Sequence, residues 1–312
     1  MKNAVIAEQL LTVRDYLRYG VSLLGEHPVY FGHGTDNAWD EALSLVLSTL
    51  NLPLNTSEHV LDARLLTSER EKLVENLHRR VFDRVPVPYI THQSWFCGLE
   101  FYIDERALIP RSPIAEIIQA YFKPWYQGEY PSKILDLCAG SGCIGIACAY
   151  AFEDAEVTVS DISQDALDVA AINVEKHQLQ EQVSLVQSDL FEHVVGEFDI
   201  IVSNPPYVDS GDYSSMPEEF VHEPGMALTS GELGMDHPVA ILQGANKYLT
   251  EDGVLVLEVG NSGEHLEMLL PNVDFNWVEF ENGGHGVFVI SRAELEYHAD
   301  DINELALGSA DR

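Results

Sequence analysis

The sequence predicts an α/β fold in which a doubly wound, mostly parallel sheet carries helices on both faces. From Lys133 onward, short apolar runs typical of buried strands alternate with segments of helical spacing, which is the pattern of a parallel sheet. A glycine-rich turn separates the first of these strands from the helix that follows it. Near the end, two extended runs are joined through Asn282-Gly283-Gly284, a sequence typical of hairpins. We therefore expect the sheet to end in an antiparallel strand.

Residues 1–84 are expected to form a small helical domain ahead of that sheet. Apolar residues recur there at helical spacing, and residues that favour helix N-termini precede two of the apolar stretches. The segment contains neither a glycine loop nor a nucleophile beside a base, so we assign it to substrate recognition or packing. The expected helices are residues 4–24, a second helix capped by Asp36 or Asn37, and residues 68–81 with Ser68 and Glu71 spaced as a capping box.

Residues 85–112 are expected to be a linker that contains a β-hairpin. The run Val85-Pro86-Val87-Pro88-Tyr89-Ile90 breaks the helical period, because proline lacks the N–H that a helix interior needs. Two extended stretches, Ser94–Phe96 and Glu100–Ile103, then flank Gly98, which predicts the hairpin.

Residues 113–295 are expected to hold the sheet, and residues 296–312 an acidic tail. A helix from Ile114 to Phe122 comes first. The expected strands lie near residues 133–137, 155–160, 183–187, 198–203 and 252–258, with final extended runs at 275–280 and 286–290. The expected helices lie near residues 143–152, 163–177, 237–249 and 262–270.

Length and composition exclude several classes of protein. The chain has 312 residues, 46% of them hydrophobic, which suits a large domain plus a smaller one. It has no apolar run of 18 residues and no N-terminal signal pattern, so neither a membrane span nor a signal peptide is expected. The four cysteines match no CxxC pair and no HExxH occurs, so no metal site is expected. These features favour a reducing, cytoplasmic location.

The formal net charge of −34 argues against duplex DNA or an RNA backbone as the main partner. Phosphate binding needs clusters of Lys and Arg, and this chain has 17 basic residues against 51 acidic ones. An acidic surface suits a strongly basic protein partner, although solubility or a salty cytoplasm accounts for the same charge.

The glycine-rich turn after the first predicted strand is a candidate cofactor site. Gly140, Gly142 and Gly145 match the GxGxxG dinucleotide pattern, and glycines let a backbone approach a ligand closely. In dehydrogenases the first glycine follows the strand directly, whereas here Asp136 precedes the turn by four residues. An anion at that position disfavours a pyrophosphate and suits a cationic amino group. A nicotinamide-dependent dehydrogenase is therefore a remote alternative.

Two further acids follow the next two predicted strands. Asp161 comes about 20 residues after the glycines, where a carboxylate can bind both ribose hydroxyls, although it can also be a helix cap. Asp189 can accept a hydrogen bond from an adenine amino group, with Leu190 beside the ring. Ala139 and Ile162 lie next to these residues and complete the candidate set. Three acids and a glycine loop together describe a site for an adenosine with a cationic amino-acid tail, which is S-adenosyl-L-methionine.

Asn204-Pro205-Pro206-Tyr207 follows the predicted strand 198–203 and is the candidate catalytic and substrate-binding segment. In open α/β sheets ligands bind at the carboxyl ends of strands. Two prolines make the segment stiff, so that the Asn204 side chain and the Pro205 carbonyl can hold one planar –NH2 group. Tyr207 can then cover the face of that group. A nucleobase and a side-chain amide both fit this description.

With these motifs the sequence resembles the class I methyltransferases and, more narrowly, the protein-glutamine N(5)-methyltransferases. Members of that family modify release factors or a ribosomal protein, and the resemblance covers nearly the whole chain. The release-factor branch has a Pro-Glu/Asp-Thr-Glu run where this chain has Ser112-Pro113-Ile114-Ala115-Glu116 after Arg111. Residues 257–262 and 283–288 are also similar to the ribosomal branch, whose substrate is the basic large-subunit protein L-three.

The resemblance implies roles for individual residues. Asp136, Gly140, Asp161, Asp189 and Asn204 would bind the cofactor, and the segment from Asn204 to Tyr207 would hold the substrate glutamine. Independently of the resemblance, Arg111 is a candidate for contact with the substrate or the cofactor carboxylate, with a salt bridge between domains as an equally weighted alternative.

Three other functions remain open at this point. A release-factor glutamine methyltransferase differs only in its protein substrate. A DNA adenine N(6)-methyltransferase would grip a flipped base in the same way. A non-catalytic ribosome-assembly factor would bind the cofactor without turnover.

Overall fold

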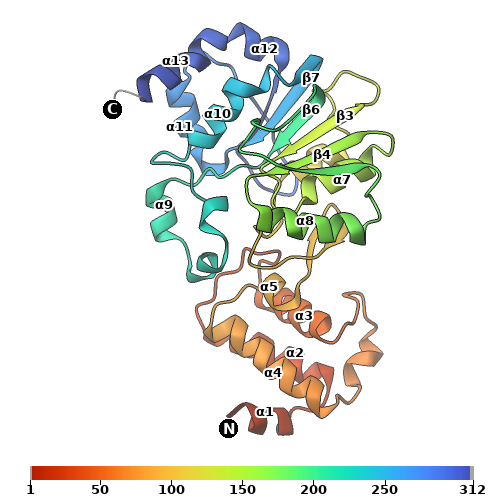
Figure 1. Ribbon diagram of the computed structural model, residues 1–312. Helices are drawn as coiled ribbons and strands as arrows, with labels where there is room; N and C mark the ends of the chain where they lie inside the picture. Colours follow the sequence, from red (N-terminus) through yellow and green to blue (C-terminus); the bar gives the residue numbers. More distant parts are fainter. Residues whose placement is uncertain (1, 310–312) are drawn as a thin grey trace. The chain divides into compact units, whose positions relative to one another are not determined.

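The computed structural model describes residues 2–309, which fall into two compact units (Figure 1). The helical unit consists of Met1–Ser94, Ile103–Glu105 and Pro217–His222. The sheet unit consists of Trp95–Tyr102, Arg106–Met216 and Glu223–Arg312.

The helical unit packs its helices around one apolar core. Its elements are α1 (Lys2–Gln9), α2 (Val13–Glu26), α3 (Ala38–Thr49), η1 (Glu58–Asp62), α4 (Thr67–Phe82) and α5 (Val87–Thr91). The core includes Leu17, Leu45 and Leu77, each 1% exposed or less. The apolar residues that recur at helical spacing in this part of the sequence therefore form the buried faces of the helices, as expected.

The hydrogen bonds that begin α2 and α4 differ from those expected from the sequence, whereas the cap of α3 agrees. The prediction of one helix over residues 4–24 is wrong, because Thr12 caps α2 and ends the regular structure that α1 began. Asn37 caps α3 as predicted, through bonds from two backbone N–H groups. The predicted capping box of Ser68 and Glu71 is wrong, since Glu69 accepts the bond, from the Leu66 N–H at 2.7 Å.

The segment Val85–Ile90 was expected to break the helical period and instead contains α5. Pro88 lies in the first turn of this helix, where a missing N–H costs nothing. The hairpin that follows is confirmed as a two-stranded sheet of β1 (Ser94–Phe96) and β2 (Leu99–Phe101), with Gly98 at φ +77° between them.

A buried ion cluster holds residues 217–222 in the helical unit, although they are far from the other helices in sequence. Arg80 is 1% exposed and contacts Glu41 Oε1 at 2.5 Å and Glu219 Oε1 at 3.1 Å. Its remaining nitrogen donates to the Tyr30 carbonyl at 2.7 Å. Glu219 also accepts the Tyr30 N–H at 2.8 Å. A guanidinium this deeply buried is stable only with such partners.

The sheet unit contains the predicted parallel sheet with an antiparallel end. Strand order is β5-β4-β3-β6-β7-β9-β8, with parallel pairing from β5 through β7 and antiparallel pairing of β9 to β7 and β8. The strands are β3 (Lys133–Leu137), β4 (Glu156–Asp161), β5 (Val183–Gln187), β6 (Phe198–Ser203), β7 (Leu249–Glu258), β8 (Asn276–Trp277) and β9 (Val287–Ser291). This is the class I methyltransferase arrangement that the sequence predicted.

Helices cover both faces of this sheet, as Figure 1 shows. Along β3, Ile134 packs into one apolar cluster with Ile146 of α7, and Leu135 into the other with Ile241 of α10. Successive residues of the strand thus pack into the cores on opposite faces of the sheet, because side chains alternate between the two faces of a pleated strand. The helices of this unit are α6 (Ile114–Gln119), α7 (Cys143–Ala151), α8 (Gln164–Lys176), α9 (Ser210–Ser215), α10 (Asp236–Ala245), α11 (Gly263–Leu269), α12 (Arg292–Tyr297) and α13 (Ala299–Ser309), with short 3₁₀ turns η3 (Gly225–Ala227) and η4 (Gly260–Ser262). A further 3₁₀ turn, η2 (Glu218–His222), belongs to the helical unit.

The C-terminal segment is more ordered than an acidic tail. Residues 296–309 include the end of α12 and all of α13, and Ile302 is 2% exposed in the core that α10 also lines. Within residues 2–309, no helix is both long and apolar enough to cross a membrane.

Candidate methyl-transfer site

Polar side chains meet at the carboxyl ends of four neighbouring strands. The sheet register pairs Leu137 of β3 with Ser160 of β4 and Ser203 of β6, and pairs Ser203 with Leu257 of β7. The next residue on each neighbouring strand is therefore at the same edge. These next residues are Asp161, Asn204 and Glu258. The structure thus brings the predicted Asp161 and Asn204 together with Asp136, and adds Glu258.

The turn after β3 needs glycine for two different reasons. Gly140 and Gly142 adopt φ of +55° and +74°, which other residues rarely tolerate. Gly145 is in α7, and a Cβ there would lie 2.6 Å from Val159 Cγ2 and 3.1 Å from Asp136 Cβ. The turn therefore lies tightly against the ends of β3 and β4. Ala139 is 8% exposed and fixes the turn through its N–H, which donates to the Ser160 carbonyl at 3.0 Å.

Asp136 is a buried carboxyl with one oxygen left without a partner. Its Oδ2 accepts the Gly145 N–H at 2.7 Å, and no described residue bonds to its Oδ1. Burial raises the pKa of Asp136 to about 8. The hydroxyl of Ser141, in the adjacent turn, is likewise buried without a partner. A cationic amino group in front of Asp136 would supply the missing bond and stabilise the ionised carboxylate.

The other predicted cofactor residues lie at the ends of β4 and β5. Asp161 Oδ2 accepts the Gly140 N–H at 2.8 Å and Oδ1 accepts the Ser163 N–H at 2.9 Å, whereas the N-terminus of α8 is capped by Ser163 itself. Burial raises its pKa. Each of its oxygens retains a second lone pair for a hydroxyl donor. Ile162 is 49% exposed, and Asp189 is exposed beside Leu190, which has φ +45°.

Asn204 and Pro205 present unused hydrogen-bond acceptors. Among the described residues, none donates to the Asn204 side chain or to the Pro205 carbonyl. Pro205 itself is buried, and Asn204 and Pro206 are half-buried. Ser203 anchors the strand before them, since its hydroxyl donates to the Leu137 carbonyl at 2.6 Å. The segment is therefore fixed to β3 while its acceptors remain open.

Tyr207 is locked in place by a hydrogen-bonded chain of buried groups. Its hydroxyl donates to Glu258 Oε1 at 2.9 Å, and the Ser112 hydroxyl donates to Glu258 Oε2 at 2.5 Å. Burial raises the pKa of Glu258 to about 7, and burial followed by the nearby Glu258 raises the pKa of Tyr207 well above its ordinary value. The Ser262 hydroxyl donates to the Tyr207 carbonyl at 2.7 Å. A Cβ on Gly260 would lie 2.5 Å from the Tyr207 ring.

Arg111 is engaged in a bidentate ion pair within the sheet unit. Its two terminal nitrogens contact Glu223 Oε1 at 2.6 Å and Oε2 at 2.8 Å, and the Glu223 side chain is fully buried. Glu223 also accepts the Ile109 N–H at 3.1 Å. Arg111 therefore forms a salt bridge, but this salt bridge lies within the sheet unit and not between domains as the alternative expected. The pair ties the residues after Asn204–Tyr207, the segment called the clamp from here on, to the segment before α6.

Four side chains of this arrangement were not singled out as site residues from the sequence. They belong to Ser112, Glu223, Glu258 and Ser262, of which Glu258 is central. It ends the predicted strand 252–258, just as Asp161 ends its own strand, so the same rule of acids at strand ends would have identified it. The link between Ser112 and Glu258 spans 146 positions and leaves no local signal.

Comparison with known proteins places the chain among methyltransferases. The family model "Methyltransferase small domain" matches residues 126–236. A "Ribosomal protein uL3 glutamine methyltransferase" of Francisella tularensis subsp. tularensis is 47% identical over 301 residues, covering 96% of each chain. A relative with the same name from Neisseria gonorrhoeae is 45% identical, covering 93% of this chain and 97% of the relative. A solved methyltransferase of Pyrococcus furiosus is 19% identical, covers 62% of this chain and 89% of its own, and has a TM-score of 0.46.

Proposed function

Because the chain belongs to the family of the ribosomal protein uL3 glutamine methyltransferases, we propose that it methylates a glutamine side-chain amide of uL3, the L-three protein, with S-adenosyl-L-methionine as donor. That it is a methyltransferase of protein glutamine follows from the family. The observation that carries the proposal is the open pair of acceptors at Asn204 and Pro205, one strand away from the unpartnered oxygen of Asp136.

The residues at the strand ends fit S-adenosyl-L-methionine. Asp136 offers a buried acceptor for its ammonium group, and Gly140 leaves the turn free of side chains, with nothing within 4 Å of an added Cβ. Asp161 would bind the ribose hydroxyls, with Asp189 and Leu190 at the adenine. When bound, the cofactor supplies a methyl group on a sulfonium, which is electrophilic and loses its positive charge on transfer.

The protein's task is to orient a poor nucleophile. The nitrogen lone pair of an amide is delocalised into its carbonyl. Asn204 Oδ1 and the Pro205 carbonyl would each accept one N–H of the glutamine, which aims the nitrogen and stabilises the positive charge that grows on it. Tyr207 would cover the amide plane from a position that Glu258 and Gly260 fix. No strong base is required before transfer, because the nitrogen loses its proton readily once alkylated.

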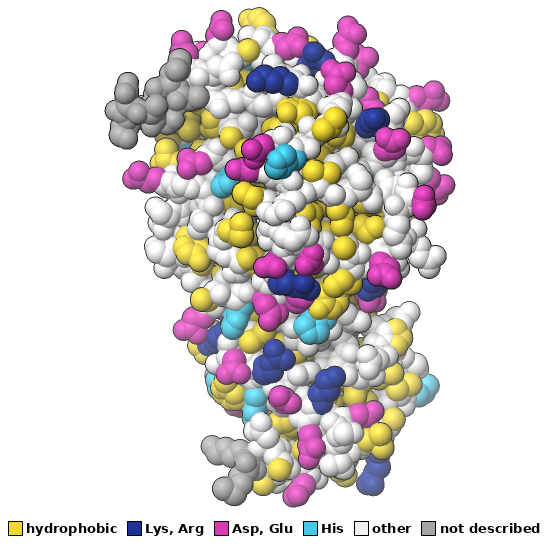
Figure 2. All heavy atoms as spheres, in the orientation of Figure 1, with side chains coloured by type: hydrophobic (Ala, Val, Ile, Leu, Met, Phe, Trp, Pro, Cys, Tyr) yellow, Lys and Arg dark blue, Asp and Glu magenta, His cyan; other side chains and the backbone are white. Residues whose placement is uncertain are grey.

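Charge supports a basic protein as the substrate. Ribosomal proteins carry Lys and Arg to bind RNA phosphates, and this chain has a net charge of −34. Acidic side chains are spread over the face shown in Figure 2 and outnumber basic ones there. The helical unit would contribute to recognition, as residues 1–84 were expected to do. Such a substrate implies action in the cytoplasm, where ribosomal proteins are assembled.

A methyl-transfer assay with purified uL3 and release factor tests the proposal. We expect radioactive label from S-adenosyl-L-methionine on a glutamine of uL3 and none on the release factor. Label on the release factor alone would move the substrate to the sister branch. Cofactor binding without label on either protein would favour an assembly factor, and tight duplex DNA binding at low salt would favour a DNA methyltransferase.

Asn204→Ala tests the mechanism itself. It removes the side-chain acceptor and should lower kcat at least a hundredfold, while the Kd for S-adenosyl-L-methionine stays within a few-fold. Asn204→Gln keeps the amide but moves it by one carbon. It should be nearly as inactive as Asn204→Ala, because the rate acceleration depends on how the glutamine amide is oriented. Near-wild-type turnover by Asn204→Ala would refute the assignment.

A further inference from the structure

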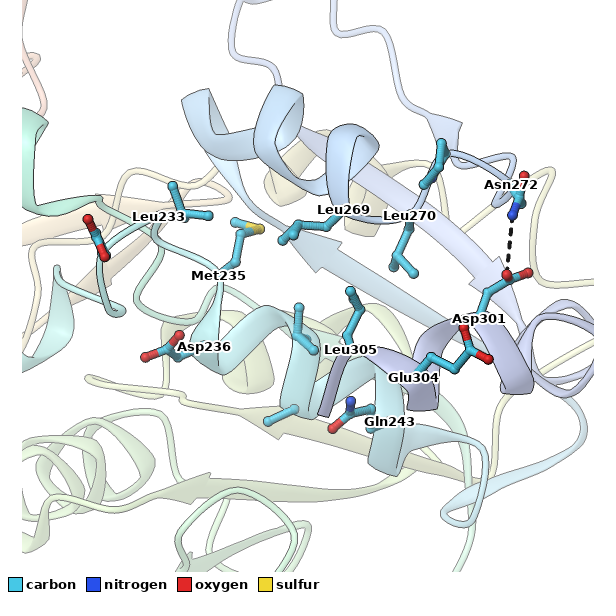
Figure 3. A pocket seen from close by; sticks show the side chains of 14 residues that line it. Leu233, Met235, Asp236, Gln243, Leu269, Leu270, Asn272, Asp301, Glu304 and Leu305 are labelled. Carbon is cyan, nitrogen blue, oxygen red and sulfur yellow. Dashed lines mark hydrogen bonds between the residues drawn. The ribbon is translucent and has the colours of Figure 1, made fainter. Parts of the chain in front are cut away.

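A groove of about 770 Å³ lies in the sheet unit between α10, α11 and α13, outside the strand-end site (Figure 3). Its volume falls within the range of about 300–1,000 Å³ that is typical of ligand sites. Apolar side chains from three segments line it, with Leu233 and Met235 from the segment that leads into α10, Leu269 on α11 and Leu305 on α13. Leu233 is 45% exposed, so the apolar lining is accessible from solvent.

The rim of this groove is acidic at both ends. Asp236 lies at one end and Asp301 with Glu304 at the other, as Figure 3 shows, and Glu232 also lines it. Among the described residues that line the groove there is no Lys or Arg. An apolar floor with only negative charge at its ends selects a ligand that has apolar side chains flanked by cations.

One wall of the groove packs against the back of the methyl-transfer site. Gly234 lies between Leu233 and Met235, which both line the groove, and a Cβ on Gly234 would lie 2.1 Å from the Tyr207 carbonyl oxygen. The Leu233 carbonyl is held by His265 Nδ1 at 3.0 Å. A polypeptide whose glutamine occupies the Asn204 and Tyr207 clamp thus has the groove as its next surface.

We propose that this groove docks a basic segment of the ribosomal protein substrate that carries apolar side chains between Lys or Arg residues. This inference rests on the proposed function, because the ribosomal protein supplies both the cations and the polypeptide. Charge complementarity and the direct contact with the clamp identify the substrate as the occupant, in preference to a second copy of this chain, which is itself acidic.

The test compares two triple variants that remove the same charge. The groove variant is Glu232→Gln with Asp301→Asn and Glu304→Gln. The control is Glu153→Gln with Glu175→Gln and Glu181→Gln, three exposed acids elsewhere in the sheet unit. With full-length uL3 at low salt we expect the groove variant to raise KM about tenfold at unchanged kcat, and the control less than twofold. At about 0.5 M salt the difference should disappear, because exposed charges are then screened.

Two further measurements separate the possible failures. A short glutamine peptide that reaches only the clamp should be methylated equally by all three proteins, and a loss there by the groove variant would overturn the groove assignment. A photo-crosslinking benzoylphenylalanine in place of Glu304 should capture uL3. Capture of a second copy of this chain instead would overturn the proposal.

The outcomes also separate the docking proposal from the proposed function. If the wild-type protein methylates uL3 and the groove variant has the same KM as the control variant, the docking proposal fails and the proposed function stands. If wild-type protein leaves uL3 unlabelled, the proposed function itself fails, and the docking proposal with it.

Discussion

Replacing Glu258 by Gln should make the protein more stable at neutral pH than the wild type, and the gain should grow with pH. The carboxyl is 4% exposed and contacts Tyr207 and Ser112 through hydrogen bonds, with Arg111 nearby as a cation. Glutamine has nearly the same shape and can accept the Tyr207 hydroxyl bond. The substitution therefore removes the ionisable proton with little other change.

The magnitude follows from the pKa of Glu258, which burial raises from 4.5 to about 7. Between these values the folded protein holds a proton that the unfolded chain has released. The stability that Glu258 contributes is therefore fully present below pH 4.5 and is lost as the pH rises through 7. Each tenfold change in proton affinity is worth about 1.4 kcal/mol, so the loss amounts to roughly 3 kcal/mol. Glutamine stays neutral over this pH range, so the variant does not lose this part of its free energy of unfolding.

Urea unfolding from pH 5 to pH 8 measures this effect. Three of the four tryptophans belong to the sheet unit, so their fluorescence reports on the unit that contains Glu258. The free energy of unfolding of Glu258→Gln minus that of the wild type should rise by about 2.5 kcal/mol over this range, because part of the loss has already occurred at pH 5. Glu264→Gln removes an exposed carboxyl from neighbouring α11 and controls for loss of an acid as such. A difference that stays constant with pH would refute the assignment of a buried carboxyl whose pKa is raised by burial.

Three other substitutions test separate parts of the structure. Gly260→Ala would place a Cβ 2.5 Å from the Tyr207 ring, so it should lower kcat more than tenfold in the methylation assay while calorimetry finds the Kd for S-adenosyl-L-methionine unchanged. Asp136→Asn removes the buried anion and should weaken cofactor binding by about 10- to 100-fold in the same calorimetry, and an unchanged Kd would argue against an ammonium partner. Arg80→Ala leaves the buried Glu41 without its cation and Glu219 with only the longer Arg84 contact at 3.5 Å, and it should destabilise the helical unit by about 3–5 kcal/mol in urea unfolding. Arg79→Ala, one position earlier, should cost far less, and equal losses would contradict the role of the buried cluster.

Strand and helix positions in the sheet unit were predictable because their signals are local. Apolar runs such as 133–137 and 198–203 coincide with β3 and β6, since a buried parallel strand must be apolar on both faces. The failures lie where short-range hydrogen bonds compete with periodicity. Thr12 interrupts an otherwise regular apolar stripe, and Pro88 is compatible with a helix because it lies in the first turn.

The sequence by itself determined the strand-end chemistry, because each acid, glycine and asparagine of the candidate site sits next to a recognisable strand. Only the tertiary structure decided how these groups are supported. The hydrogen bonds from Ser112 and Tyr207 to Glu258, and the ion pair of Arg111 with Glu223, join positions 51 to 146 residues apart. The groove is likewise assembled from three separate segments. Periodicity and motifs describe neighbours along the chain, whereas burial and pairing between distant residues exist only once the chain has folded.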